Sequence, residues 1–169
     1  VQGIEMEIHK GIPIGSGMGS SACSAVAGAL AINELMGRPL SKQDLLPYAL
    51  KGEAIASGGA IHADNVGPCL LGGMILIRSN KDFDTVNIPV PEKLYAAVVL
   101  PELQILTVDA RNILPTEISM KEGITQWGNL GGMIAGLMQQ NYALIGRSLQ
   151  DVIAEPHRAQ LIPGFYQVK

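Results

Sequence analysis

The alternation of apolar and polar residues along the chain predicts several β-strands. Residues 4–9 alternate strictly, which is typical of a half-buried strand. Residues 69–78 predict a second strand, broken by Gly72 and Gly73. The continuous apolar run 94–100 predicts a third strand, buried on both faces.

Helical periodicity separates these segments and dominates the second half of the chain. The first predicted helix begins with Ser20 or Ser21 as its N-cap, ends near Gly37, and is apolar nearly all round, so we expect it to be buried. The second is expected to start near Asp44, which would place Pro47 in the first turn, and to end near Ala56. Three more are predicted at 107–114, about 119–139 and 142–155.

A polar segment at 79–92, which carries two prolines, is the plausible domain boundary. It predicts one domain over 1–85 and a second over 86–169. The sequence enters a strand pattern at its first residues and stops just after another apolar segment. We therefore expect the chain to be a fragment of a longer protein.

Composition narrows the class of protein. Hydrophobic residues make up 47% of the 169 residues and charged residues 16%, which is typical of a globular chain. The net charge of −3 and the lack of a basic run disfavour a nucleic-acid partner. The most apolar stretch, 22–36, contains Asn33 and Glu34 and is too short to cross a membrane. Cys23 and Cys69 are expected to be buried free thiols of a cytoplasmic protein.

The strongest chemical signal is a glycine-rich segment before the first predicted helix. Glycines at alternate positions allow positive φ angles and close approach of a ligand, and the helix that follows directs its free N–H groups at the loop. A flexible turn capped by serine is the alternative. The segment lacks the Gly-Lys-Ser/Thr ending of a Walker loop and the glycine spacing of a dinucleotide fingerprint. Its residues are Pro13, Ile14, Gly15, Ser16, Gly17, Met18, Gly19, Ser20, Ser21, Ala22 and Cys23.

A second group of polar residues follows within a short distance. Glu53 on the second predicted helix offers hard oxygen atoms of the kind that Mg²⁺ prefers. His62, Asp64 and Asn65 follow it, and Arg111 comes one helical turn after a threonine, where its guanidinium can pair with a carboxylate. Each residue also has an ordinary interpretation: a solvated glutamate, a loop histidine, a turn and a surface arginine.

Taken whole, these motifs resemble a known family. The string 13–22 is similar to the phosphate-binding motif of the GHMP kinases, with Met18 in place of the usual leucine. The segment from His62 to Pro68, followed by the glycine pair at 72–73, resembles the homoserine kinases within that family, as do 107–115 and 151–164. The resemblance runs from about residue 5 to the end of the chain.

The resemblance implies a role for each candidate. Residues 13–23 would surround the phosphates of ATP, and Ser20 and Glu53 would hold Mg²⁺. His62 would line the substrate pocket, while Asp64 would receive the substrate amino group. Asn65 would hydrogen-bond the hydroxyl that is phosphorylated, and Arg111 would bind the substrate carboxylate. Thr107 would lie beside the γ-phosphate.

It also implies a fold and a reaction. The fold would be α+β, with part of an S5-like domain followed by part of a ferredoxin-like domain. The first strands and a closing glycine loop of the family would be missing. The parent enzyme would be a cytoplasmic homodimer that phosphorylates L-homoserine with ATP in threonine biosynthesis. Another GHMP kinase with a mevalonate-type or sugar substrate, or a non-catalytic anion-binding or assembly module, stays open.

Overall fold

The computed structural model describes residues 3–56, 63–103, 105 and 107–169. The chain divides into two compact units, Val1–Asn87 and Ile88–Lys169. Helices and a small sheet occur together, as the α+β fold class predicts. The assignment of domains to 1–85 and 86–169 stays a prediction.

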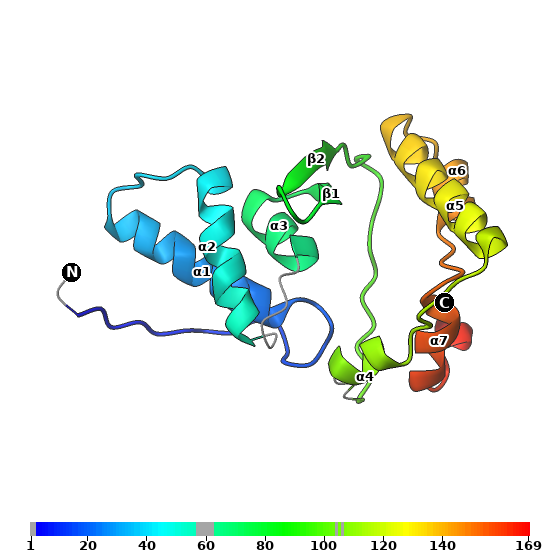
Figure 1. Cartoon of the computed structure of the whole chain (residues 1–169), viewed down its shortest axis with the longest axis horizontal. Helices are drawn as coiled ribbons and strands as arrows, with labels where there is room; N and C mark the ends of the chain where they lie inside the picture. Colours follow the sequence, from blue (N-terminus) through cyan, green and yellow to red (C-terminus); the bar gives the residue numbers. More distant parts are fainter. Residues whose placement is uncertain (1–2, 57–62, 104, 106) are drawn as a thin grey trace. The chain divides into compact units, whose positions relative to one another are not determined.

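In its described residues, the first unit consists of three helices followed by a β-hairpin (Figure 1). The hairpin strands β1 and β2 form a two-stranded sheet. Helix α3 lies directly before β1 and contacts it. The elements are α1 (Ser20–Leu35), α2 (Lys42–Ala56), α3 (Ala63–Leu71), β1 (Met74–Ser79) and β2 (Asp84–Ile88).

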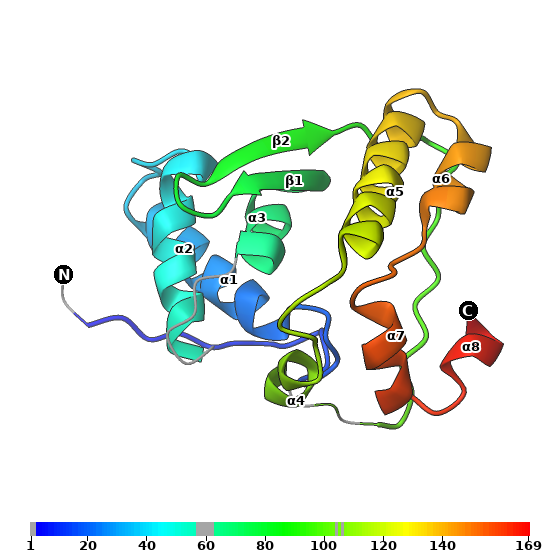
Figure 2. The same ribbon diagram turned by 45° about the vertical axis from the view of Figure 1, so that its right-hand side comes forward.

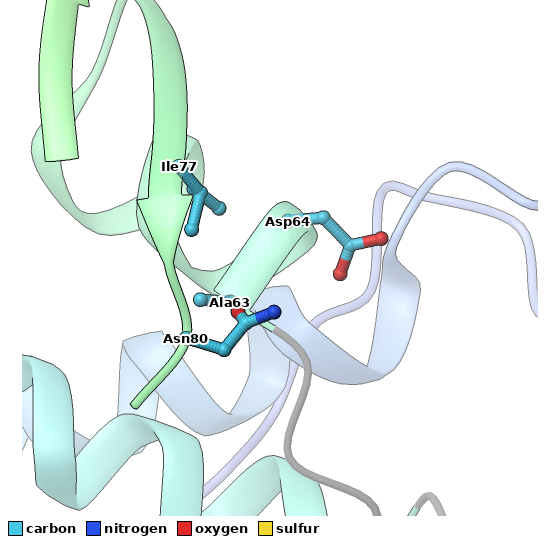
Figure 3. A pocket seen from close by; sticks show the side chains of 4 residues that line it. All are labelled: Ala63, Asp64, Ile77 and Asn80. Carbon is cyan, nitrogen blue, oxygen red and sulfur yellow. The ribbon is translucent and has the colours of Figure 1, made fainter. Parts of the chain in front are cut away.

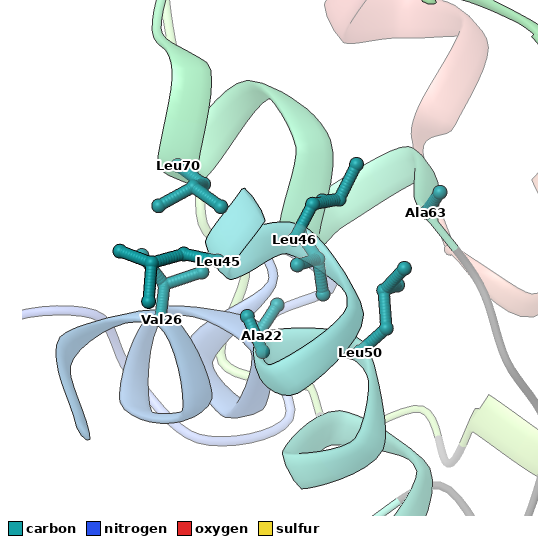
Figure 4. Packing of buried hydrophobic residues seen from close by; sticks show 9 residues of the cluster. Ala22, Val26, Leu45, Leu46, Leu50, Ala63 and Leu70 are labelled. Atoms are coloured by element: carbon teal, nitrogen blue, oxygen red, sulfur yellow. The ribbon is translucent and has the colours of Figure 1, made fainter. Parts of the chain in front are cut away.

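The three helices share one hydrophobic core, which fixes their positions relative to one another (Figure 4). Leu50, Val66 and Leu70 are its largest fully buried side chains, with at most 1% of their surface exposed. Burial of each contributes about 1.5–3 kcal/mol. The core comprises Ala22 and Val26 from α1, Leu45, Leu46, Ala49 and Leu50 from α2, and Ala63, Val66 and Leu70 from α3.

Only one face of α1 is buried, which corrects the expectation of a helix buried all round. Leu35 at its C-terminal end is 72% exposed. The apolar residues of this helix are mostly alanines and glycine, which have little surface to bury, so the pattern of apolar letters overstated its burial.

Helix α2 begins at Lys42, two residues before the expected start, and therefore contains Pro47 in its interior. The reason is a cap: the Ser41 hydroxyl accepts from the Asp44 N–H (3.2 Å), and the Asp44 carboxylate accepts from the Ser41 N–H (3.2 Å). The proline removes one internal hydrogen bond of the helix. Burial of the leucines around it offsets that loss.

The predicted strand over 69–78 is wrong in its first part. Cys69 and its neighbours belong to α3, and the strand begins only at Met74. Gly72 (φ 83°) and Gly73 (φ 68°) adopt left-handed conformations that end the helix and turn the chain into β1. The glycine pair is therefore a helix terminus, and the apolar run before it has the helical period.

The other two predicted strands, at 4–9 and 94–100, have no regular secondary structure. Ile8 is 59% exposed and Tyr95 is 86% exposed. A strand needs a partner, and within the described residues the sheet consists of β1 and β2 alone. The alternation of side chains shows strand propensity, but it cannot supply the neighbour with which a strand pairs.

The second unit is helical (Figure 2). Helices α5 and α6 lie side by side and make its largest interface. The predicted helix at 119–139 matches α5, whose N-cap Ser119 forms a capping box with Glu122. These hydrogen bonds lower the pKa of the Glu122 carboxyl below its usual range. The elements are α4 (Thr107–Asn112), α5 (Met120–Met138), α6 (Tyr142–Ser148), α7 (Glu155–Arg158), the 3₁₀ turn η1 (Ala159–Leu161) and α8 (Phe165–Val168).

The helix predicted at 142–155 ends at Ser148. The Asp151 carboxylate accepts hydrogen bonds from the N–H groups of Ile153 and Ala154, both at 2.8 Å, and so holds a turn there. An aspartate that bonds to nearby backbone competes with continuation of a helix. No helix within the described residues is long and apolar enough to cross a membrane.

Candidate functional site

The glycine-rich loop before α1 has an unusual backbone conformation. Gly15 (φ 74°), Gly17 (φ 73°) and Gly19 (φ 74°) all adopt the left-handed region, which other residues rarely enter. Between them, the Ser16 hydroxyl donates to the Pro13 carbonyl (2.7 Å) and accepts from the Met18 N–H (3.3 Å). The loop therefore has its own internal hydrogen bonds, and its alternate glycines place no side chains over the backbone.

Helix α1 begins directly after this loop, and its N-cap is Gly19. The expectation that Ser20 or Ser21 caps the helix is wrong, because the left-handed Gly19 turns the chain and both serines already lie within the first turn. The first intrahelical bond runs from the Cys23 N–H to the Gly19 carbonyl (3.0 Å). The three amides before it have no acceptor within the helix. This end of α1 therefore presents free N–H donors and the positive end of the helix dipole.

Ser20 and Ser21 use their hydroxyl groups differently. The Ser20 hydroxyl donates to the Ile12 carbonyl (3.0 Å) and so ties the start of the loop to the helix. The Ser21 hydroxyl donates to Glu53 Oε1 on α2 (2.8 Å). The hydrogen bond from α1 to the Glu53 carboxylate is therefore made by Ser21, while the Ser20 hydroxyl is held by Ile12.

Glu53 is a buried carboxylate, with 9% of its surface exposed. Its Oε1 atom accepts the Ser21 hydrogen bond, and its Oε2 atom is buried without a hydrogen-bond partner in the described part of the chain. A buried oxygen of a charged group that has no partner is unfavourable unless something binds it. The position suits a cation at the start of α1.

The start of α3 lies against the glycine loop. A Cβ atom at Gly19 would lie 3.1 Å from Asn65 Oδ1 and 3.3 Å from Asn65 Cβ, so the two residues are in close contact. Asp64 is exposed, and its carboxylate accepts from the Asn65 N–H (3.1 Å). The contact brings the amide of Asn65 and the N-terminus of α1 into one site, although Gly19 and Asn65 are 46 positions apart in the sequence.

A pocket of about 230 Å³ opens beside Asp64 (Figure 3). Its described lining comes from the start of α3, at Ala63 and Asp64, and from the β1 region, at Ile77 and Asn80. Asn80 was not singled out by the sequence. Its proximity to Asp64 depends on the packing of helix α3 on β1, whereas the sequence predicted a strand over 69–78, broken by Gly72 and Gly73.

The two cysteines differ from the expectation of buried thiols. Both are free, but Cys69 is exposed and Cys23 is only partly buried. Their sulfur atoms lie 3.5 Å apart, with the Cys69 thiol donating to Cys23 Sγ. Partial burial, the hydrogen bond to Cys23 and the charge interaction with it raise the pKa of the Cys69 thiol to about 11.

The remaining candidates belong to the second unit or lie outside the described residues. His62 and the side chain of Thr107 lie outside the described residues. Arg111 is an exposed residue of α4 in the second unit. Among the residues with described positions, no three His, Cys, Asp or Glu side chains converge on a possible metal ion. The first unit thus contributes the loop, Ser21, Glu53, Asp64 and Asn65.

The chain is similar in sequence to known proteins. Residues 2–73 match the GHMP kinases N terminal domain. The chain is 54% identical over 166 residues to a homoserine kinase of Chlorobium phaeobacteroides (strain BS1), covering 98% of this chain and 52% of that protein. It is 49% identical over 164 residues to one of Chloroherpeton thalassium, with coverages of 97% and 51%.

A crystal structure of homoserine kinase from Cytophaga hutchinsonii has the same fold, with a TM-score of 0.91 and 53% identity. The match covers 95% of this chain and 50% of that one. The chain spans about half the length of the curated relatives that it matches. It resembles the homoserine kinases of the GHMP superfamily along nearly its whole length, and it shares the fold of the matching half.

Proposed function

From this resemblance to the homoserine kinases, we propose that the chain supplies the phosphate loop and part of the substrate pocket of an ATP-dependent homoserine kinase. The observation that carries the proposal is the contact of Asn65 with Gly19. It places a side-chain amide that could hydrogen-bond the substrate next to a helix N-terminus that suits an anion. The reaction would convert L-homoserine and ATP into O-phospho-L-homoserine and ADP.

The loop would bind the phosphates through its backbone. Residues 11–23 contain no lysine or arginine, so the positive charge for the phosphates cannot come from a side chain of this segment. The free amides at the start of α1 and the left-handed glycines suit oxygen atoms that approach from outside. Substitution of a bulkier residue for Gly17 or Gly19 would obstruct that approach.

The residues present fit a divalent cation. Glu53 offers one carboxylate oxygen that is buried without a partner and one that now meets the Ser21 hydroxyl. Mg²⁺ at this position would be held by Glu53 with a serine hydroxyl of α1, either Ser21 or, after rotation away from Ile12, Ser20. When bound, the ion would neutralise charge on the transferring phosphoryl group.

The substrate would lie between the loop and the start of α3. Asp64 would receive the amino group, Asn65 would hold the hydroxyl toward the loop, and His62 would complete the lining. Asn65 cannot accept the hydroxyl proton, because a neutral amide is not basic near pH 7. We infer that the chain acts by positioning and by electrostatic stabilisation of the charge that develops.

The resemblance further assigns Arg111 to the substrate carboxylate and Thr107 to a place beside the γ-phosphate. The bidentate geometry of a guanidinium suits a carboxylate. We propose a cytoplasmic homodimeric enzyme that serves threonine biosynthesis. These assignments rest on the resemblance to the homoserine kinases.

Titration calorimetry of the purified protein with ATP, at increasing Mg²⁺, tests the proposal. In Glu53→Gln, the gain in ATP affinity that Mg²⁺ produces should fall by about tenfold or more, since a contact to a charged group contributes about 1.5–3 kcal/mol. Glu34→Gln is the matched control, because Glu34 pairs with Arg38 on the exposed side of α1 and should leave the affinity unchanged.

L-homoserine, mevalonate and galactose, each added with Mg·ATP, separate the alternatives. Binding of L-homoserine in preference to the other two supports the proposal. Preference for another of these compounds would point to a different GHMP kinase. A non-catalytic assembly module would bind neither the nucleotide nor any of the three compounds. Equal affinity of Glu53→Gln and the parent protein for Mg·ATP would show that Glu53 is not a metal ligand.

A further inference from the structure

The two cysteines of the chain form a pair whose thiol groups have no part in the proposed reaction. Cys23 lies in the first turns of α1, just after the glycine loop, and Cys69 lies near the end of α3. Their sulfur atoms are 3.5 Å apart, although the residues are 46 positions apart in the sequence. Both are free thiols.

Packing holds the pair in place. Ala22 and Leu70, the chain neighbours of the two cysteines, have 1% of their surface exposed and belong to the core shared by α1, α2 and α3. The thiols are therefore carried by two packed helices rather than by loops. Because Cys69 is exposed, a small molecule can reach the pair from solvent.

The separation of the sulfur atoms suits two kinds of chemistry. A disulfide requires the sulfur atoms to approach to about 2.05 Å, which is a short movement from van der Waals contact for side chains that can each turn about one bond. A trivalent arsenic atom can bind two thiols that lie side by side without any oxidation. Both reactions need two thiols, and neither can be completed at a single cysteine.

We propose that Cys23 and Cys69 are a dithiol modification site, which takes small disulfides and closes to an intramolecular disulfide between α1 and α3. The first cysteine, as its thiolate, attacks one sulfur of a small disulfide such as oxidised glutathione, and one glutathione thiol leaves. The second cysteine then attacks the protein sulfur of this mixed disulfide, and the second glutathione leaves. The cysteines lose two electrons and two protons, and the small disulfide becomes two thiols.

The site differs from a highly reactive cysteine. The hydrogen bond and partial burial that raise the Cys69 pKa to about 11 leave little thiolate at neutral pH. Attack by Cys69 on a small disulfide is therefore slow at neutral pH. The bond would join the helix that follows the glycine loop to the helix that begins with Asp64 and Asn65, and so would connect the two parts of the candidate site covalently.

Incubation of the purified, reduced protein with oxidised glutathione tests the site. We expect both thiols to disappear together in a thiol assay under denaturing conditions, with a loss in intact mass of two hydrogen atoms and one peptide pair linked through Cys23 and Cys69. Dithiothreitol should restore both thiols. The Cys23→Ser and Cys69→Ser variants should instead keep a single glutathione, because neither has a second thiol to release it.

Phenylarsine oxide provides a test without oxidation, and it can be applied to the parent protein even if a variant fails to fold. One equivalent should bind and protect both cysteines from alkylation in the parent protein. Protection of one cysteine alone, stable glutathione adducts on the parent protein, cross-linked dimers in place of the internal bond, or no reaction with either reagent would overturn the proposal.

Discussion

The contact between α5 and α6 is closest to the chain backbone at Gly136, and replacement of this glycine by alanine is a sharp test of the second unit. A Cβ atom at Gly136 would lie 2.9 Å from Ile145 Cγ1 and 3.0 Å from the Ile145 backbone nitrogen. The first neighbour can move, but the second is part of the α6 backbone. The helices must therefore separate to accept the added methyl group.

The magnitude follows from two opposing terms. Replacement of a helical glycine by alanine favours the helix by about 1 kcal/mol. Overpacking at a close helix contact costs about 1–3 kcal/mol. Gly131 on the same helix has no atom within 4 Å of its would-be Cβ, so Gly131→Ala gains the first term without the second. We expect Gly131→Ala to stabilise the unit and Gly136→Ala to be less stable than Gly131→Ala by about 1–3 kcal/mol.

Urea unfolding followed by the fluorescence anisotropy of Trp127 measures this difference. Trp127 is the one tryptophan in the sequence and lies on α5, so its signal reports on the second unit. In a unit of this size, a difference of 1 kcal/mol corresponds to roughly 4–8 °C in melting temperature. Equal stability of the two variants, within about 0.5 kcal/mol, would show that α6 does not pack on α5 at this glycine.

Three further predictions concern single residues elsewhere. Arg111→Lys keeps the charge but loses the bidentate geometry of the guanidinium. In steady-state kinetics of the full-length enzyme, the KM for L-homoserine should therefore rise more than the KM for ATP. A larger rise for ATP would place the arginine at the nucleotide. Alkylation of Cys69 by iodoacetamide, measured by mass spectrometry of peptides, should accelerate about tenfold per pH unit between pH 7 and 9, because this range lies below the Cys69 pKa of about 11. A plateau of the rate in this range would contradict the raised pKa. Asn33→Ala should lower the free energy of unfolding in urea by about 1–3 kcal/mol, because the buried Asn33 amide donates to the Leu40 carbonyl and accepts from the Leu40 N–H. An unchanged urea midpoint would show that these two hydrogen bonds do not stabilise the fold.

Local signals in the sequence predicted elements well where the cause of the element is itself local. The serine before α5 and the glutamate three residues later form the capping box that starts this helix at Met120. The alternate glycines of the loop adopt the left-handed conformations that their spacing indicates. In each case the residues that decide the conformation lie within one turn of one another.

Prediction failed where a distant partner decides the conformation. Ile8 alternates with polar neighbours as a strand residue should, yet it is exposed and unpaired in the described structure. The apolar run before Gly72 suits either a strand or a buried helix by composition, and packing against α1 and α2 settles it as α3. The hydrogen bond between Ser21 and Glu53, which the sequence did not indicate, likewise depends on the rotation of α1 against α2, which no local pattern specifies.

That rotation has an identifiable physical origin at a glycine. A Cβ atom at Gly52 on α2 would lie 3.2 Å from the Ala25 Cβ on α1, so the two helices are in close contact at a point where both side chains are minimal. Ser21 lies four residues before Ala25 on the same face of α1, one turn nearer the glycine loop. Glu53 follows Gly52 directly, and the close approach at Gly52 therefore places its carboxylate within hydrogen-bond distance of Ser21. The position of the candidate metal ligand is thus a consequence of helix packing, and the residues that set it are the small ones beside the site rather than the polar ones within it.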